Sequence, residues 1–469
     1  MRYYFLGICG TAMASLAILL KQKGHEVWGS DQNVYPPMID LLKENRIPVW
    51  EGFHLDHLKK SFDVAVIGNV FSRGNVELEE ILRSRMLFAS LPEIIRREFI
   101  HFKKSIVISG THGKTTTTAL MSWILETAGL SPSFLIGGIS KNFQTSARLG
   151  NGDYFVIEGD EYDSAFFDKR PKFLHYFPHY LIINNIEFDH ADIYRDVEQI
   201  KSEFRKLIRC MSKEALIIGN GDDPQVREVL NPLYSRLETF GRGKENDWRL
   251  EDLSFATDYL RFGIKHKDKD WGEIQIPGMG EYQAYNVLAT VAVAADLGID
   301  EATLQKALHS FQNVQRRLDY WGELNGAPFY DDFAHHPTAI RATLSAIRQR
   351  YPRRRIRAIF EPRTNTTVQN IFQRELSEAL ALADQVMLGP LYRAERLPPE
   401  RRLDLSKIKE DLEKKQIAVT LLSDYSSIYE LLESQVSRDE VIVLMTNGSL
   451  GGVYADLRDK IRGNPRNKK

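Results

Sequence analysis

The most constraining feature of this chain is a short glycine-rich turn that joins a β-branched strand to a helix. The turn, Gly110-Thr111-His112-Gly113-Lys114-Thr115, follows an apolar run at 106–109 and precedes a predicted helix at 115–128. Its glycines let the backbone approach an oxygen-rich ligand, Lys114 can place a positive charge between β- and γ-phosphates, and the Thr115 hydroxyl can bind Mg²⁺. The turn therefore predicts an α/β domain that binds the phosphates of a nucleotide.

Short strands alternate with helices along most of the chain. Predicted strands lie at 3–8, 25–28, 64–67, 106–109, 154–157 and 180–184, and later at 328–330, 357–361, 385–388, 418–421 and 440–445. With helical patterns between them, such as 12–23, they place the chain in the α/β class with mostly parallel sheets. Between about 216 and 277 the pattern changes, and the runs 216–218 and 258–264 predict antiparallel strands added to the central sheet. A helix is predicted after them at 285–295.

Length and composition limit the class of protein further. A chain of 469 residues accommodates about three domains of roughly 150 residues each. The 62 Lys and Arg nearly balance the 63 Asp and Glu, which excludes a global basic field for nucleic acid. Cys9 and Cys210 lack metal-ligand spacing and predict free thiols in a reducing compartment. No stretch approaches about 18 uninterrupted apolar residues, so we expect a cytoplasmic protein without a membrane span.

Acidic and polar residues follow two of the predicted strands. Glu158-Gly159-Asp160-Glu161-Tyr162-Asp163 comes after the strand at 154–157, and hard carboxylate oxygens suit Mg²⁺. Glu158 is the preferred ligand because it lies nearest the strand end. His190 lies among carboxylates after the strand at 180–184, which favours a Mg²⁺-ligand or substrate-positioning role and allows a second metal there.

The first turn of the chain, Gly7-Ile8-Cys9-Gly10-Thr11, partly matches a dinucleotide-binding fingerprint. Cys9 stands where the fingerprint requires glycine. Asp31 follows near the end of a second strand, where a dehydrogenase would hold a ribose. Two interpretations of this turn remain. It binds a nucleotide or diphosphate at the helix N-terminus, or it is a tight turn that binds no ligand. An NAD-dependent oxidoreductase is the alternative from another class, and Cys9 argues against it.

Two polar segments follow strands in the last third of the chain. Asp331-Asp332-Phe333-Ala334-His335-His336-Pro337 follows the strand at 328–330. Arg363 follows the strand at 357–361, where a guanidinium can bind a substrate carboxylate in bidentate fashion. A structural ion pair explains Arg363 equally well.

In chain order these motifs resemble the Mur ligase family over essentially the whole sequence. The resemblance rests on the first-turn glycines, Gly110–Thr115, Glu158 with Asp160 and Glu161, Asp189 and His190, Asn286, Arg317, and Asp332 with His335 and His336. It implies three domains. These are a UDP-sugar-binding Rossmann-like domain over 1–103, a central P-loop-type ATPase domain over 104–312, and a C-terminal Rossmann-like α/β domain over 313–469 that contacts peptide and nucleotide.

Two branches of this family extend UDP-N-acetylmuramate, one with L-alanine and one with a whole peptide. The alanine branch shares the Asp-Asp-x-x-His-His-Pro run. Other stretches resemble the peptide branch, which acts in peptidoglycan recycling: 29–38, 164–170, 185–192, 360–366 and 447–452. The implied reaction joins UDP-N-acetylmuramate to L-alanyl-γ-D-glutamyl-meso-diaminopimelate through an acyl phosphate, with ATP and Mg²⁺. The UDP-N-acetylmuramate–L-alanine ligase and a non-catalytic nucleotide-binding regulator are alternatives.

The resemblance also implies roles for single residues. Lys114, Glu158 and His190 would be catalytic, and Thr115, Glu158 and His190 would hold magnesium. ATP would contact Gly110, Thr111, His112, Gly113, Lys114, Thr115, Thr116, Asn286, Arg317 and Asp332. The UDP-sugar would contact Gly10, Thr11, Ser30, Asp31, Asn69 and Arg73, and the peptide Arg363 and Asn365. Other branches carry a carbamoylated lysine near the second metal; here neither Lys201 nor Lys206 is expected to be modified.

Overall fold

The N-terminal part of the chain forms a five-stranded parallel sheet in the order β3-β2-β1-β4-β5. The computed structural model describes residues 1–32, 34, 38–231, 233–256 and 259–463. The strands are β1 (Arg2–Leu6), β2 (Glu26–Asp31), β3 (Val49–Glu51), β4 (Val64–Ile67) and β5 (Phe88–Ser90), and the helices are α1 (Thr11–Gln22), α2 (Met38–Glu44), α3 (Val76–Arg83) and α4 (Leu91–Glu98). The strand order reverses between β1 and β4, the point at which open α/β sheets bind ligands.

The central part contains a ten-stranded sheet in the order β17-β16-β15-β14-β13-β12-β6-β9-β7-β8. Its strands are β6 (Lys104–Ser109), β7 (Ser133–Ser140), β8 (Thr145–Arg148), β9 (Tyr154–Gly159), β12 (Tyr180–Ile183), β13 (Leu216–Asn220), β14 (Arg236–Gly241), β15 (Trp248–Phe255), β16 (Tyr259–His266) and β17 (Lys269–Pro277). The helices are α5 (Lys114–Thr127), α6 (Val197–Arg209), α7 (Pro224–Val229), α8 (Glu281–Asp296) and α9 (Glu301–His309).

The direction of one predicted strand in this sheet is wrong. The run 216–218 lies in β13, which pairs parallel with β12 and with β14. Helix α6 carries the chain back across the sheet before β13 begins, and a crossover of this kind returns the next strand in the parallel direction. The prediction for 258–264 is confirmed from Tyr259 onward, because β16 pairs antiparallel with β15 and β17, while residue 258 lies outside the described residues.

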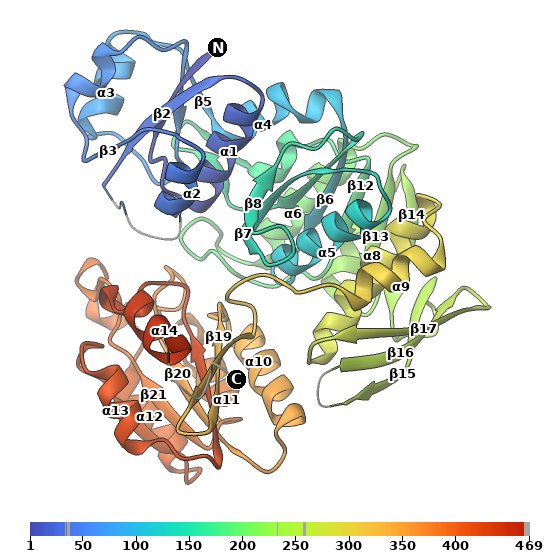
Figure 1. Ribbon diagram of the computed structural model, residues 1–469, viewed down its shortest axis with the longest axis vertical. Helices are drawn as coiled ribbons and strands as arrows, with labels where there is room; N and C mark the ends of the chain where they lie inside the picture. The colour runs from blue at the N-terminus through green and yellow to red at the C-terminus, as the bar shows by residue number, and fades with distance from the viewer. Residues whose placement is uncertain (33, 35–37, 232, 257–258, 464–469) are drawn as a thin grey trace.

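The C-terminal part forms a six-stranded sheet in the order β18-β19-β23-β20-β21-β22, parallel except for β18. Its strands are β18 (Asp319–Leu324), β19 (Ala327–Asp332), β20 (Arg355–Phe360), β21 (Gln385–Leu388), β22 (Ala418–Leu421) and β23 (Glu440–Met445). Its helices are α10 (Pro337–Arg350), α11 (Gln373–Leu380), α12 (Leu405–Glu413), α13 (Ile428–Gln435) and α14 (Tyr454–Gly463). Figure 1 shows the three sheets as separate lobes.

Smaller elements complete the connections between these units. They are the hairpin β10 (Asp163–Ala165) and β11 (Asp168–Pro171), and the 3₁₀ turns η1 (Leu55–Lys59), η2 (Ile100–Phe102), η3 (Lys172–His175), η4 (Asn370–Phe372), η5 (Ala394–Arg396), η6 (Pro399–Arg401) and η7 (Leu450–Gly452).

The first two units share one apolar core. Helices α5, α8 and α9 cover one face of the central sheet, and α6 and α7 pack on the other face. That second face also meets α1 and α4 of the N-terminal unit, so a single cluster of buried side chains runs through both units. The C-terminal sheet has its own buried clusters on its two faces. This arrangement fixes the first two units together, and one cluster of the third unit also includes Met279 and Tyr282 of the central unit.

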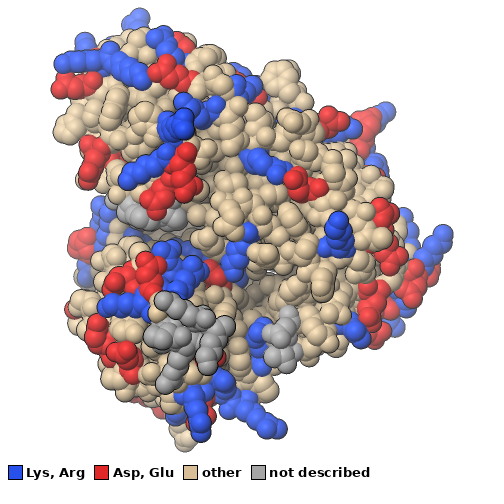
Figure 2. Space-filling view, viewed as in Figure 1, with Lys and Arg blue, Asp and Glu red and all other residues tan. Residues whose placement is uncertain are grey.

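The surface carries charges of both signs. Lys and Arg are interspersed with Asp and Glu over the face that Figure 2 shows. Within the described residues, no helix has both the length and the apolar character needed to cross a bilayer.

The contact between α4 and β1 contains a buried carboxylate, Glu98, that we expect to contribute to stability. Glu98 accepts hydrogen bonds from Tyr3 Oη at 2.8 Å, Lys23 Nζ at 2.9 Å and Arg97 Nε at 3.1 Å. Burial disfavours the ionised form, but the bonds from Lys23 and Tyr3 outweigh it and lower the pKa of Glu98 to about 2. The stabilisation is therefore present above the ordinary pKa of 4.5 and is lost as the pH falls toward 2.

Glu98→Gln should lower the free energy of unfolding by about 2 kcal/mol at pH 7, because three donors lose their charged acceptor. The loss should be smaller at pH 4, since the wild-type carboxylate then contributes less. Chemical denaturation at the two pH values measures both. Glu44→Gln, on the exposed end of α2, is the control and should change stability by less than about 0.5 kcal/mol. A penalty for Glu98→Gln that grows on acidification would contradict this account.

Candidate active site

The glycine-rich turn between β6 and α5 adopts a conformation that only glycine fits. Gly113 precedes the first residue of α5 with φ of +84°, and Gly110 has φ of +127°. A Cβ atom on Gly113 would lie 2.7 Å from Asn286 Oδ1 and 2.8 Å from Asn184 Nδ2. The turn is thus held close to two neighbouring segments, and it presents the free N–H groups of the helix N-terminus as an anion-binding site.

Lys114 is held at this turn by an ion pair with Glu161, which follows the neighbouring strand β9. Its Nζ donates to the carbonyl oxygen of Gly110 at 2.7 Å and to Glu161 Oε2 at 2.8 Å. Burial disfavours the ammonium, but the charges of Glu161 and Asp160 outweigh it and raise the pKa of Lys114. The pKa of Glu161 is correspondingly lowered, chiefly by Lys114 against the effect of burial. Lys114 therefore stays charged where the turn opens into a cavity.

Thr115 and Glu158 lie together, as a shared metal site requires. Thr115 Oγ1 lies 3.3 Å from Glu158 Oε2, and Arg317 from the C-terminal unit donates to the same hydroxyl at 3.2 Å. The other carboxylate oxygen of Glu158 accepts from the backbone N–H of Gly137. Burial raises the pKa of Glu158, so a cation beside it would favour its ionised form.

His190 lies in a second group of possible ligands, with Asp160 and Glu161. The ligand atoms of these three residues all lie within 4.8 Å of one another, and His190 Nε2 is 3.4 Å from Glu161 Oε1. Burial would lower the pKa of His190, but the hydrogen bond and charge of Glu161 raise it to about 9. His190 has φ of +54°, and its backbone N–H is held by Asp189 Oδ1 at 2.7 Å. A divalent cation fits this set once the imidazole has lost its proton.

From the acidic segment only Glu158 is predicted as a metal ligand, although Asp160 and Glu161 are the two carboxylates that accompany His190. Asp160 and Glu161 occupy the same segment, so the signal was present in the sequence. Closeness to the strand end does not show which of the three carboxylates can bind a metal. After β9 the segment turns toward the glycine-rich turn, and this brings Glu161 to Lys114.

Residues predicted to contact the nucleotide also come from α8 and from the C-terminal unit. The Asn286 Nδ2 group on α8 is buried without a hydrogen-bond partner among the described residues, which marks it as a donor available to a ligand. Asp332 instead braces its own loop: it accepts from the backbone N–H of Leu318 at 2.7 Å and of Ala334 at 2.8 Å. Burial raises the pKa of Asp332.

One cavity of about 790 Å³ brings these groups together. Its lining includes Thr11 and Leu91 of the N-terminal unit, Thr111–Thr116, Glu158, Asp160, His190 and Asn286 of the central unit, and Arg317, Asp332 and His335 beyond. A cavity lined by all three units can place two substrates and a nucleotide at one point.

The residues predicted for the UDP-sugar, apart from Thr11, do not line this cavity. Ser30 is buried and its hydroxyl contacts Tyr4 Oη at 2.8 Å and Glu77 Oε2 at 2.7 Å. Asp31 accepts from the backbone N–H of Cys9 at 2.8 Å. Arg73 pairs with Glu79 on the surface, and Gly10, Asn69 and Arg73 lie in turns next to β1 and β4. Gly10, Ser30, Asp31, Asn69 and Arg73 lie at or after the carboxyl ends of β1, β2 and β4.

A second cavity, of about 730 Å³, lies in the C-terminal unit and contains Arg363. The Arg363 guanidinium lies 3.9 Å from the centre of the Tyr392 ring, and its Nη1 is 3.4 Å from Glu361 Oε1. The ion pair with Glu361 is consistent with a structural role for Arg363, and its place in the cavity lining is consistent with binding of a ligand. Asn365 donates to Asp192 of the central unit at 3.0 Å.

Lys201 and Lys206 both lie on α6, and neither lines the main cavity. Lys201 is buried and pairs with Glu198 and Glu228, and Lys206 pairs with Glu203 on the surface.

Three family models match successive parts of the chain: the Mur ligase catalytic domain over residues 2–103, the Mur ligase middle domain over 108–294, and the Mur ligase glutamate ligase domain over 316–448. The chain therefore belongs to the Mur ligase family.

Within the family, full-length similarity connects the chain to ligases that add a peptide. It is 38% identical, over 98% of both chains, to the UDP-N-acetylmuramate–L-alanyl-γ-D-glutamyl-meso-2,6-diaminoheptandioate ligase of Escherichia coli. The crystal structure of the murein peptide ligase of Psychrobacter arcticus superposes with a TM-score of 0.76 at 32% identity, covering 98% of this chain and 99% of that one. The UDP-N-acetylmuramate–L-alanine ligase of Caldicellulosiruptor bescii is 32% identical over 84% of each chain.

Proposed function

We propose that this protein is an ATP-dependent amide ligase of the cytoplasm that acts in peptidoglycan recycling. It joins the lactyl carboxylate of UDP-N-acetylmuramate to the free amine of L-alanyl-γ-D-glutamyl-meso-diaminopimelate. The observation that carries the proposal is the 38% identity over 98% of both chains to a ligase of that name. The alanine ligase is the weaker candidate, with 32% identity over 84% of each chain.

The oxidoreductase alternative has no support in the first turn. Cys9 stands where the dinucleotide fingerprint requires glycine, and its backbone N–H donates to the carboxylate of Asp31. The phosphate-binding turn would also lack a purpose in such an enzyme.

Activation of the sugar acid is assigned to the main cavity. A carboxylate is a poor acyl donor, and transfer of the γ-phosphoryl group from ATP to it creates an acyl phosphate with a good leaving group. Such a transfer needs positioning and charge neutralisation more than covalent help from the protein. Lys114 and the N–H groups at the start of α5 would bind the phosphates, and Asn286, Arg317 and Asp332 would position the nucleotide. Magnesium, when bound, would neutralise phosphate oxygens.

The ligand groups for magnesium fall into two sets. Thr115 and Glu158 would hold one ion, and His190 with Asp160 and Glu161 would hold a second. Their fit rests on the oxygen-rich donor sets and on the closeness of the ligand atoms. Binding at the second set requires His190 to release a proton and Lys114 to share Glu161.

Amide formation completes the reaction. The neutral amine of the peptide attacks the acyl carbon and forms a tetrahedral intermediate. The bond from that carbon to the phosphate oxygen then breaks, and the nitrogen gives up one proton, which leaves with the phosphate as hydrogen phosphate. Arg363 and Asn365 would hold the peptide from the C-terminal unit. The domain limits 1–103, 104–312 and 313–469 remain our proposal for the units that supply sugar acid, nucleotide and peptide.

A substrate competition test distinguishes the two ligases. Purified protein with ATP, Mg²⁺ and UDP-N-acetylmuramate receives either the tripeptide or L-alanine, and phosphate release and the coupled product are measured. We expect kcat/KM for the tripeptide to exceed that for L-alanine by at least about 100-fold, because the peptide offers more contacts to the site. Omission of UDP-N-acetylmuramate is the control. Faster product formation from L-alanine would overturn the substrate assignment.

A further inference from the structure

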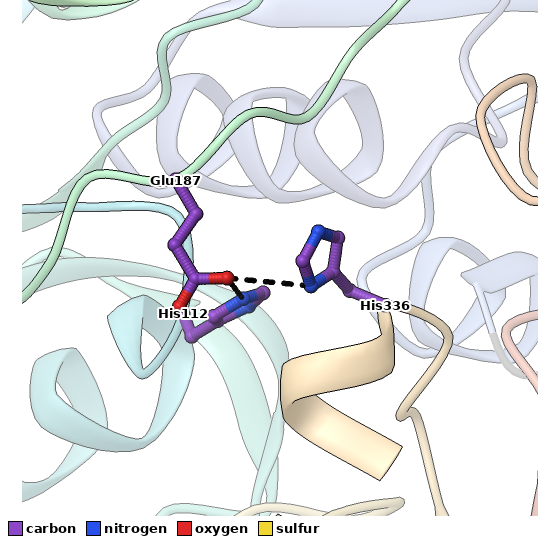
Figure 3. A group of neighbouring side chains, drawn as sticks. All are labelled: His112, Glu187 and His336. Atoms are coloured by element: carbon purple, nitrogen blue, oxygen red, sulfur yellow. Dashed lines mark ion pairs between the residues drawn. The ribbon is translucent and has the colours of Figure 1, made fainter. Parts of the chain in front are cut away.

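Three side chains outside the two proposed magnesium sets converge between the central and C-terminal units. His112 belongs to the phosphate-binding turn, Glu187 follows β12, and His336 precedes the first residue of α10 (Figure 3). His112 Nε2 and His336 Nδ1 each lie 3.6 Å from the same carboxylate oxygen, Glu187 Oε2. All three ligand atoms lie within 4.8 Å of one another. Two imidazoles and one carboxylate therefore point at a common centre.

The spacing fits shared coordination better than hydrogen bonding. A separation of 3.6 Å is too long for a hydrogen bond from a ring nitrogen. Around tetrahedral Zn²⁺, bonds of about 2.0–2.1 Å place neighbouring ligand atoms about 3.4 Å apart. His112 Nε2 is also buried and has no hydrogen-bond partner among the described residues. A buried nitrogen left without a partner costs free energy unless something binds it.

Neighbouring hydrogen-bonding groups orient His336 and Glu187, as such groups orient the ligands of known metal sites. His336 Nε2 lies 3.2 Å from the carbonyl oxygen of Phe188, and donation to that oxygen leaves the Nδ1 lone pair toward Glu187. Thr338 Oγ1 donates to Glu187 Oε2 at 2.6 Å and orients the carboxylate. The backbone N–H of Thr338 competes for His336 Nδ1, but that bond is long, at 3.3 Å. A metal ion would replace this one weak interaction.

We propose that His112, Glu187 and His336 form a site for Zn²⁺ or a cation of similar softness, separate from the magnesium sets. Mg²⁺ prefers oxygen ligands, whereas two imidazoles favour transition-metal ions. Three protein ligands leave a fourth position open to water or to a phosphate oxygen. Because His112 and His336 come from different units, the bound ion joins the phosphate-binding turn to α10. This inference does not depend on which acceptor the enzyme uses.

Zinc binding to the full chain tests the site. A chromophoric zinc chelator competes with the protein for Zn²⁺ in the absence of nucleotide. Mg²⁺ is present at about 10 mM, which is enough to fill weak oxygen sites. One equivalent should bind to the wild type. Glu187→Gln and His336→Asn should each weaken binding at least about 20-fold, since each removes a ligand. His190→Asn is the matched control and should retain wild-type affinity.

Folding effects are separated from ligand effects in two ways. Asparagine is a good residue for the start of a helix, so His336→Asn keeps the cap of α10. Co²⁺ gives the wild type a visible absorption band of a low-coordinate site, and Glu187→Gln should lose that band while its circular dichroism is unchanged. No tight zinc binding by the wild type, or equal binding by the wild type and both folded variants, would overturn the proposal. So would loss of zinc binding in His190→Asn alone.

Discussion

Lys114→Ala is expected to lower the rate of ligation about 1000-fold while binding of UDP-N-acetylmuramate stays within about threefold of the wild type. The Lys114 ammonium is the charge at the start of α5, and removal of one donor to developing negative charge typically costs about 100- to 1000-fold in kcat. The sugar nucleotide is assigned mainly to the N-terminal unit, so its affinity should survive. Phosphate release in the complete reaction and calorimetric titration with UDP-N-acetylmuramate measure the two effects.

The ion pair with Glu161 offers a sharper form of this experiment. Lys114→Ala leaves Glu161, which is only 2% exposed, without its 2.8 Å partner. The double variant Lys114→Ala, Glu161→Gln removes that buried charge and should recover thermal stability without recovering ligation. Lys206→Ala, on the surface of α6, is the matched control and should keep activity within about twofold. Ligation restored in the double variant would show that Lys114 only neutralises Glu161.

Much of the fold could be predicted because parallel strands leave a simple trace in a sequence. Strands buried on both faces appear as continuous apolar runs, and for this reason the predicted ranges 64–67, 385–388 and 440–445 coincide with β4, β21 and β23. The range 418–421 also coincides with β22, although this edge strand is mostly exposed. Strand direction leaves no such trace. The run 216–218 has the same pattern whether β13 is parallel or antiparallel, and only the crossover through α6 decides between them.

The candidate site was predictable where chemistry and topology coincide. Residues at or after the carboxyl ends of β6, β9 and β12 meet because these strands are neighbours in one sheet. The turn at Gly110, Glu158 near the end of β9, and His190 could therefore be placed together in advance. The pairing of Lys114 with Glu161 could not, since it depends on how the acidic segment turns after β9. The sequence also does not indicate that the Ser30 hydroxyl forms hydrogen bonds with Tyr4 and Glu77.

Arg363, predicted to bind the peptide, has two neighbours in the structure, Glu361 and Tyr392. Its contact with Glu361 is a single one of 3.4 Å, and the second partner is the face of Tyr392 at 3.9 Å. Stacking on a ring fixes the plane of a guanidinium while leaving N–H groups at its edge free to bind. Arg363 lines the cavity of about 730 Å³, and Gly448 leaves room for its side chain, because a Cβ at 448 would lie 2.2 Å from Arg363 Cδ.

We therefore expect Arg363→Ala to lower kcat/KM for the tripeptide about 100-fold. The peptide carries several carboxylates, and charge-assisted hydrogen bonds to one of them contribute about 1.5–3 kcal/mol each. The kcat/KM of Arg363→Lys should lie between that of Arg363→Ala and that of the wild type, because an ammonium keeps the charge and loses the bidentate geometry. Initial rates at varied tripeptide, ATP and UDP-N-acetylmuramate give the three KM values, of which only that for the peptide should rise.

A structural role for Arg363 makes a different prediction, and the two can be separated in one series. If the ion pair with Glu361 matters chiefly for folding, Arg363→Ala should lower the melting temperature, and the folded fraction should keep its KM for the peptide. Arg396→Ala, an exposed arginine in η5, is the matched control for loss of a guanidinium near the same cavity. Because Glu361 also accepts the Thr446 hydroxyl, its carboxylate keeps a partner in the variant, and a change confined to peptide KM would assign Arg363 to substrate binding.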